Sequence, residues 1–330
     1  MNFKKLSITL AASLLLTGCT GSANTSESVE VLEDGEYVVS SLTDRNFTAY
    51  ELYESIVSTS TGESAIFEAV IQTVMDENYP ITDDMELDAD LIIEQIEESY
   101  YYYYGEDWES ELVYSLVSSG FYSVDDYRES LVLSLQYSAF LSAYVDENYD
   151  EVLADYIDYC APRFLSIIMV SVADMDAITE DEQATLDEVT ALVNSTKEFS
   201  ETATEYSYDT SASSAGSIGL IDNMYDLETA YGTDVQTAAF ALSEGEYTSE
   251  PVAGDSGYYF IKCDSFDETE IDEYIQTLGI DTPLISYDSY MLYEIYNSYE
   301  LTYEDAEMET IVNTVVETQL AAKAELRGEE

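Results

Sequence analysis

Few side chains in this sequence are suited to covalent chemistry or to metal binding. The chain of 330 residues contains no histidine and has three cysteines, Cys19, Cys160 and Cys263, against 70 aspartates and glutamates. Zinc and similar ions are usually held by histidine and cysteine. The acidic segment 82–90 lacks the glycine and the terminal glutamate of a calcium-binding loop. We therefore expect neither a metal centre nor another cofactor.

Cys19 has the clearest sequence context of the three cysteines. It ends the segment "LTGC", in which small residues precede the cysteine, as in a lipobox. Lys4 and Lys5 precede an apolar run, residues 6–16, that is too short to span a bilayer permanently and is typical of an export signal. We expect residues 1–19 to be a lipoprotein signal peptide, with lipidated Cys19 as the new N-terminus. An ordinary signal peptide with an incidental cysteine is the alternative.

The composition predicts a folded and very acidic protein. Residues 20–35 are mostly small and polar, which indicates a flexible tether. The formal net charge of −61 excludes nucleic acid, because phosphate binding needs a basic surface. The charge favours cationic unfolded segments or divalent ions as partners, or it serves solubility alone. With 46% hydrophobic residues and 31 tyrosines, the chain has ample material for cores, in two or three domains.

The region 36–160 is predicted to be mainly helical after a short β-like lead-in. Thr48 and Glu51 form a capping box that opens a helix, and five further helical patterns follow. Tyr100 to Tyr104 are five consecutive tyrosines. Five successive rings on a helix cannot all face one core, so some lie on the surface, where they can grip an unfolded partner. Packing of these rings within a helix pair is the alternative.

The region 161–265 has a different pattern. A β-branched run after Pro162 predicts a strand, and two helical segments follow, the first with a capping box at Thr179. The small-residue segment 208–221 is expected to be a loop, followed by a helix, an edge-like strand at 247–252 and a final strand at 258–263. This order indicates an α+β unit. Residues 266–330 are again helical.

Two motifs in series carry a resemblance to a known family. The segment "AAFALSEGEYTSEPV" is followed by "GYYFIK", and together they resemble the parvulin family of peptidyl-prolyl isomerases over about residues 162–264. With the lipobox and the helical flanks, nearly the whole mature chain resembles the PrsA-type extracytoplasmic foldase lipoproteins, and more distantly the chaperone SurA. The resemblance implies an α+β fold, with a central parvulin domain of a small antiparallel sheet and helices. An all-helical chaperone domain, built from residues 36–160 and the C-terminal region 266–330, flanks it.

The resemblance also implies a set of site residues. Asp209 takes the acidic or thiol position of the family's loop, and Ile167 and Tyr259 take the places of its two histidines. The other positions form the proline pocket or the glycine-rich turn: Tyr231, Val235, Phe240, Ala215, Gly216 and Gly219. Isomerisation of a prolyl bond needs no covalent chemistry, only a pocket that favours the twisted amide. Two interpretations stay open: a weak isomerase that uses Asp209 and Tyr259, whose hydroxyl can donate to the carboxylate, or a scaffold that binds peptides without accelerating isomerisation.

The resemblance further implies that the first and last strands of the parvulin domain are antiparallel neighbours. This arrangement brings Cys160 and Cys263 towards each other, and thiols outside the membrane tend to oxidise. We therefore expect a Cys160–Cys263 disulfide. Two buried free thiols are the alternative.

The resulting functional expectation is a membrane-anchored foldase and chaperone at the extracytoplasmic face. Its partners would be unfolded exported polypeptides and, through the lipid anchor, the membrane. The sequence leaves open whether the chain forms a homodimer. A solute-binding lipoprotein of a transport system is the alternative function, although no two-lobed α/β pattern is visible.

Overall fold

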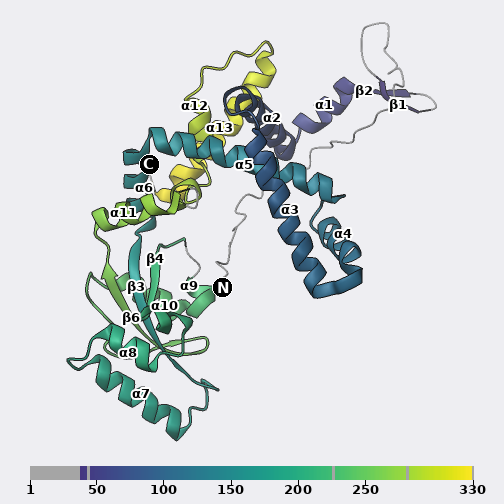
Figure 1. Cartoon of the computed structure of the whole chain (residues 1–330). Helices are drawn as coiled ribbons and strands as arrows, with labels where there is room; N and C mark the ends of the chain where they lie inside the picture. The colour runs from purple at the N-terminus through teal and green to yellow at the C-terminus, as the bar shows by residue number, and fades with distance from the viewer. Residues whose placement is uncertain (1–37, 43–44, 225–226, 280–281, 329–330) are drawn as a thin grey trace. The chain divides into compact units, whose positions relative to one another are not determined.

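The computed structural model describes residues 38–42, 45–224, 227–279 and 282–328, and these divide into two compact units (Figure 1). The first unit combines the described residues up to Glu147 with those from Asp288 onward. The second is the continuous segment Asn148–Tyr287. The predicted signal peptide, Cys19 and tether lie outside the described residues. None of the helices within the described ranges is both long enough and apolar enough to cross a bilayer.

The first unit is helical apart from one hairpin. Its elements are β1 (Val38–Leu42), β2 (Arg45–Thr48), α1 (Ala49–Val57), α2 (Ser60–Asn78), α3 (Asp83–Tyr104), α4 (Trp108–Ser118), α5 (Val124–Glu147), α12 (Met291–Asn297) and α13 (Ala306–Arg327). The predicted capping box at Thr48 is present: its hydroxyl accepts from Glu51 N at 3.2 Å, and the Glu51 carboxylate accepts from Thr48 N at 3.1 Å. The C-terminal region therefore completes a helical domain that the N-terminal region begins, as the sequence predicts.

The core of the first unit joins segments that are far apart in the chain. α13 packs along α2, and α3 packs on both α4 and α5. Phe67 of α2 is 1% exposed, and its ring stacks on Tyr293 of α12 at a centroid separation of 4.8 Å. Burial of such rings supplies most of the hydrophobic stabilisation of a core. Aromatic packing thus holds α2 against α12, whereas α13, which has no aromatic residue, packs along α2 through other side chains.

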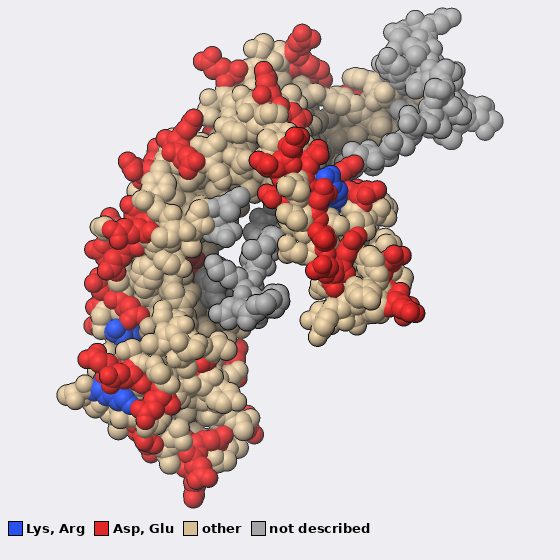
Figure 2. All heavy atoms as spheres, viewed as in Figure 1, with Lys and Arg blue, Asp and Glu red and all other residues tan. Residues whose placement is uncertain are grey.

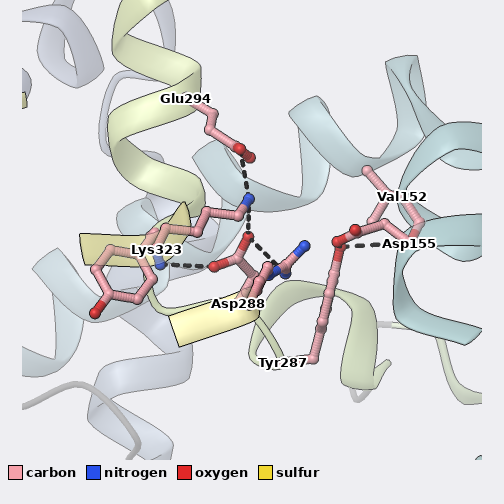
Figure 3. A network of polar contacts seen from close by, with 8 residues as sticks. Val152, Asp155, Tyr287, Asp288, Glu294 and Lys323 are labelled. Atoms are coloured by element: carbon pink, nitrogen blue, oxygen red, sulfur yellow. Dashed lines mark hydrogen bonds and ion pairs between the residues drawn. The ribbon is translucent and has the colours of Figure 1, made fainter. Parts of the chain in front are cut away.

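A buried ion network fixes α13 in the first unit (Figure 3). Lys323 of α13 donates to the Asp288 carboxylate at 2.6 Å and also to the Glu294 carboxylate, and Arg327 lies 3.4 Å from the same Asp288 oxygen. The Asp288 side chain is only 3% exposed. Burial by itself lowers the pKa of Lys323, but the hydrogen bonds to Asp288 and Glu294 outweigh burial, so the pKa lies above its usual value. Lys323 is therefore charged in the folded state.

Replacement of Lys323 by methionine is expected to destabilise the first unit by about 3 kcal/mol, because it leaves the buried Asp288 carboxylate without its main partner. Urea denaturation followed by circular dichroism measures the change in the free energy of unfolding. The double variant K323M/D288N is the control: removing the stranded charge should restore part of the lost stability. A single variant as stable as the wild type would contradict a structural role for this ion pair.

The second unit is built on a four-stranded antiparallel sheet. Its elements are α6 (Tyr149–Cys160), β3 (Arg163–Ser171), α7 (Glu180–Val193), α8 (Phe199–Tyr206), β4 (Ser217–Ile221), α9 (Leu227–Tyr231), α10 (Thr233–Ala241), β5 (Val252–Gly254), β6 (Gly257–Ser265) and α11 (Glu268–Leu278), and the strand order is β4-β3-β6-β5. α9 and α10 cover one face of the sheet, and α7 and α8 cover the other (Figure 1). This is the central α+β domain that the sequence predicts.

Contacts outside the sheet extend this unit beyond residues 161–265. Tyr287 donates to the Asp155 carboxylate of α6 at 2.7 Å (Figure 3), and its ring packs edge-on against Tyr156 at 5.4 Å. Tyr149 donates to Asp272 of α11, also at 2.7 Å. α6 and α11 therefore belong to the same compact unit as the sheet.

The strand predictions need two corrections. Segment 208–221 is not entirely a loop, because its last residues form β4, which pairs with β3. The edge strand is Val252–Gly254, whereas Tyr247 makes only an isolated bridge to Lys262. Pro251 has no N–H to donate and so interrupts a longer edge strand. All strand pairs in the described ranges are antiparallel, unlike the parallel sheets typical of α/β lobes.

Candidate functional site

The residues of the parvulin-like site lie on the sheet face that α9 and α10 cover. Ile167 is opposite Ile261, and Tyr259 is opposite Met169. The two positions that replace the family's histidines are therefore diagonal neighbours on one face of the sheet. Ile167 is 1% exposed and Val235 of α10 is fully buried. Both are core residues, so neither presents a surface to a substrate.

The Tyr259 ring fills the space at this position of the sheet. It packs edge-on against Tyr231 of α9, with ring centroids 5.5 Å apart, and only 2% of the residue is exposed. Gly254 of the neighbouring strand approaches so closely that an added Cβ would lie 2.5 Å from the Tyr259 ring and 2.2 Å from Tyr231 O. Burial, followed by the nearby charges of Asp209 and Asp255, raises the pKa of the Tyr259 hydroxyl.

Asp209 shapes its own loop. Its carboxylate accepts from the backbone N of Ser211 at 2.8 Å and caps a short 3-10 helix. Within the described residues no hydrogen bond joins Asp209 to Tyr259, so the expected donation from the tyrosine hydroxyl is absent. The adjacent Ser211 hydroxyl is buried and has no hydrogen-bond partner. The loop therefore keeps its acidic group near Tyr259 but does not form the polar network that the resemblance implies.

The turn after Asp209 keeps the backbone of a glycine-rich turn. Gly216 and Gly219 have φ values of +88° and +83°, and Ala215 also has a positive φ, +57°. An added Cβ at Gly216 would lie 2.8 Å from Ile167 O, and Ile167 N donates to Gly216 O at 2.8 Å. The turn is therefore fixed by its contact with β3, and glycine at position 216 is required for that contact.

Phe240 of α10 packs against the same core cluster as Tyr231 and also contacts the start of β3. The Arg163 guanidinium lies over its ring, 4.6 Å from the centroid, and donates to Ala239 O and Leu242 O. Arg163 begins β3, whereas Met169, the partner of Tyr259, is near its end. Phe240 is thus a partly buried neighbour of the core cluster that contains Tyr259, and its role in a substrate pocket stays a prediction.

A hollow of about 560 Å³ lies elsewhere in the second unit. Its wall includes Phe164 and Tyr274 and several carboxylates; the full lining is Phe164, Ser217, Glu244, Asp264, Ser265, Glu270, Glu273 and Tyr274. None of the predicted pocket residues contributes to it. The concave surface of this hollow is therefore separate from the Tyr231–Tyr259 region.

Cys160 and Cys263 are both buried and are not joined by a disulfide in the structure. Cys160 is the last residue of α6. Cys263 of β6 lies opposite Leu165 of β3, and Leu165 follows Cys160 by five residues in the chain. Cys160 lies at the end of a helix and not on β3, so the pairing of β3 with β6 does not place it opposite Cys263. Burial raises the pKa of the Cys263 thiol, which disfavours the thiolate needed for oxidation. The expected disulfide is thus corrected.

The second candidate site is the α3–α4 hairpin of the first unit. We call its exposed rings the hairpin tyrosines: Tyr101, Tyr102, Tyr103, Tyr104 and Tyr114. Tyr102 is 81% exposed and Tyr103 is 75% exposed, so these rings are not packed within a helix pair. In Figure 2 the end of this hairpin shows uncharged side chains next to carboxylates. Exposed aromatic surface of this kind marks an interaction site.

Sequence reasoning located Tyr100 to Tyr104 but missed the contribution of α4. Val113, Tyr114 and Val117 are exposed by 43%, 72% and 55%. Their apolar spacing resembles that of a buried helix face, and only the structure shows that α4 turns Leu112 and Leu116 inward instead. The sequence of α4 therefore gave no signal that separates its buried face from its exposed face.

Comparison with known proteins defines the class of the second unit. Residues 168–265 match the family model described as "Rotamase: PPIC-type PPIASE domain". The chain therefore carries a PPIC-type, or parvulin, domain, and the resemblance predicted from the motifs is confirmed.

The similarity extends beyond this domain. The chain is 22% identical over 228 residues to the foldase protein PrsA of Pediococcus pentosaceus, covering 69% of this chain and 70% of the relative. It is 26% identical over 261 residues to foldase protein PrsA 1 of Listeria innocua, covering 78% and 74%. Among solved structures, PrsA from Streptococcus pneumoniae is 18% identical, with a TM-score of 0.42 over 84% of this chain and 99% of that one. The sequence-based resemblance to PrsA-type foldases is thus confirmed.

The filled Tyr259 position predicts little isomerase activity. In a tetrapeptide assay with the chain lacking residues 1–19, the relaxation should stay within about twofold of the uncatalysed rate, which corresponds to tens to hundreds of seconds. Asp209→Ala should leave that rate unchanged, because Asp209 bonds its own loop. A strong acceleration that Asp209→Ala abolishes would show instead that a working pocket opens around Tyr259.

Proposed function

We propose that the protein is an extracytoplasmic foldase whose main activity is to hold unfolded exported polypeptides on the α3–α4 hairpin. The relatives are named foldases, and the second unit carries the domain type that the proposal needs. The observation that carries the proposal is the exposure of the hairpin tyrosines, in particular Tyr102 and Tyr103.

The hairpin has the surface of a promiscuous binder. Tyrosine rings offer a large amphipathic contact area at low cost in side-chain entropy. Such contacts are individually weak and do not demand one sequence, which suits a chaperone that meets many unfolded chains. Only Ala89 of α3 and Leu112 and Leu116 of α4 are buried in these helices, so most of the hairpin surface stays available to a client.

The parvulin domain supplies a second binding unit in this proposal. Its fold is complete, but the Tyr259 ring is buried against Tyr231 at one of the two positions where the resemblance implies a histidine. In this proposal the parvulin domain is a scaffold that binds apolar segments and accelerates prolyl isomerisation only weakly. Asp209 is retained close enough to raise the pKa of Tyr259 through its charge, so the site keeps the family's loop without its histidines.

The double variant Y102S/Y103S tests the holding activity. Serine and tyrosine have similar helix propensities, and both rings are exposed, so the fold should be unaffected. Loss of two aromatic contacts is expected to weaken binding of a denatured model protein by about tenfold. Light scattering during dilution of the denatured protein measures suppression of aggregation.

The matched control is Y50S/Y208S, which removes two exposed tyrosines outside the hairpin; these are 55% and 77% exposed. The control should suppress aggregation as well as the wild type. Equal loss in both variants would assign the effect to general surface hydrophobicity, and no loss in either would refute the hairpin as the holding surface.

We further propose that lipidated Cys19 anchors the mature chain to the outer face of the cytoplasmic membrane. The supporting observation is the lipobox-like segment that ends at Cys19, after an apolar run of export-signal type. An anchor of this kind keeps the holding surface close to the site where exported chains emerge.

Cys19→Ala should move the protein from the membrane fraction to the soluble extracytoplasmic fraction. Cell fractionation with immunoblotting measures the distribution, and mass spectrometry of the wild-type N-terminus should find acyl chains on Cys19. An unmodified wild-type N-terminus at another residue would instead support the ordinary signal peptide.

A further inference from the structure

The hairpin tyrosines present ring faces within a purely acidic surface. Tyr100 and Tyr104 stack at 5.5 Å, and Tyr102 and Tyr103 pack edge-on at 5.2 Å with an interplanar angle of 85°. The high exposure of the latter two rings leaves ring surface open to solvent. Segment 83–118, which comprises both hairpin helices, contains many carboxylates and neither lysine nor arginine.

The basic side chains described in the first unit do not neutralise this surface. Arg128 of α5 is held at the base of the hairpin by Asp90, at 2.5 Å, and by Glu86 O. Lys323 and Arg327 are held by Asp288 within the buried network. The carboxylates around the rings, such as Glu98, Glu106 and Glu109, therefore have no neighbouring cation on the hairpin. Figure 2 shows the same pattern, with red side chains along the hairpin.

These charges decide among the occupants that an exposed aromatic surface can have. A second copy of this chain would bring an equally acidic hairpin against the first, and like charges in contact oppose association. An anionic lipid surface is repelled for the same reason. A cationic segment meets two favourable interactions at once: attraction to the carboxylates, and contact of its ammonium or guanidinium groups with the ring faces.

We propose that the α3–α4 hairpin selects unfolded segments in which lysine or arginine alternates with apolar residues. The inference rests on the proposed holding function and names the class of polypeptide that it favours. The apolar residues pack on the hairpin tyrosines, and the cations lie over the rings and between the carboxylates. The acidic surface also raises the rate of encounter with such segments at low ionic strength.

The test compares two unstructured fluorescent peptides with the full mature chain. They share length and apolar residues, and differ only in carrying lysine or glutamate at the same positions. Fluorescence anisotropy at about 0.05 M salt should show at least about tenfold tighter binding of the lysine peptide. The difference should shrink towards parity at about 1 M salt, where the Debye length falls to about 3 Å.

Two charge variants of equal net charge locate the effect. E98Q/E106Q/E109Q removes hairpin carboxylates, and E309Q/E317Q/E325Q removes the same number from exposed positions of α13. The hairpin variant should lose most of the preference for the lysine peptide, and the α13 variant should keep it. Y102S/Y103S should weaken binding of both peptides.

The outcomes separate this inference from the proposed function. Equal affinity for the two peptides, or equal loss of preference in the two charge variants, overturns the selection of cationic segments while the holding function stands. Failure of both peptides to bind and of the chain to suppress aggregation overturns both. A self-association that Y102S/Y103S abolishes, measured by sedimentation velocity, would show that a second copy covers the rings and would also overturn the inference.

Discussion

The pairing of β3 with β6 is the constraint on which the second unit depends. Side chains alternate between the two faces of a sheet, so the register that places Met169 opposite Tyr259 also sends Ile167, Ile261 and Cys263 to the same side. That side is the core beneath α9 and α10. A tyrosine there is larger than an imidazole and apolar over most of its surface. The residue that replaces a polar group of the family therefore completes a hydrophobic layer.

Much of this architecture could be predicted from local sequence signals. The capping boxes at Thr48 and Thr179 form as expected, because each depends only on residues three positions apart. The parvulin motifs located the second unit because they too are short, continuous stretches of sequence. The strand β4 could not be predicted in this way, since Gly216 before it and Gly219 within it suggest a loop, and only the hydrogen bonds with β3 make it a strand.

The expected disulfide shows what linear spacing leaves out. It depended on the distance between two elements, and the spacing of residues along the chain does not contain that distance. Arg163 illustrates the point: it begins β3 but contacts Phe240 and two carbonyl groups at the end of α10. The exposed rings of Tyr101 to Tyr104 were located correctly, because a run of rings must expose some of them on any helix.

The division of the chain into units has a consequence for how the protein itself matures. The second unit is one continuous segment, whereas α2 of the first unit needs α13, which follows the whole second unit in the chain. Closing a loop that contains a folded domain adds entropy cost and delays long-range contacts. Chains emerge from the N-terminal end, and domains fold as units. The second unit is therefore complete before α13 is made, and until then the first unit keeps the apolar face of α2 exposed.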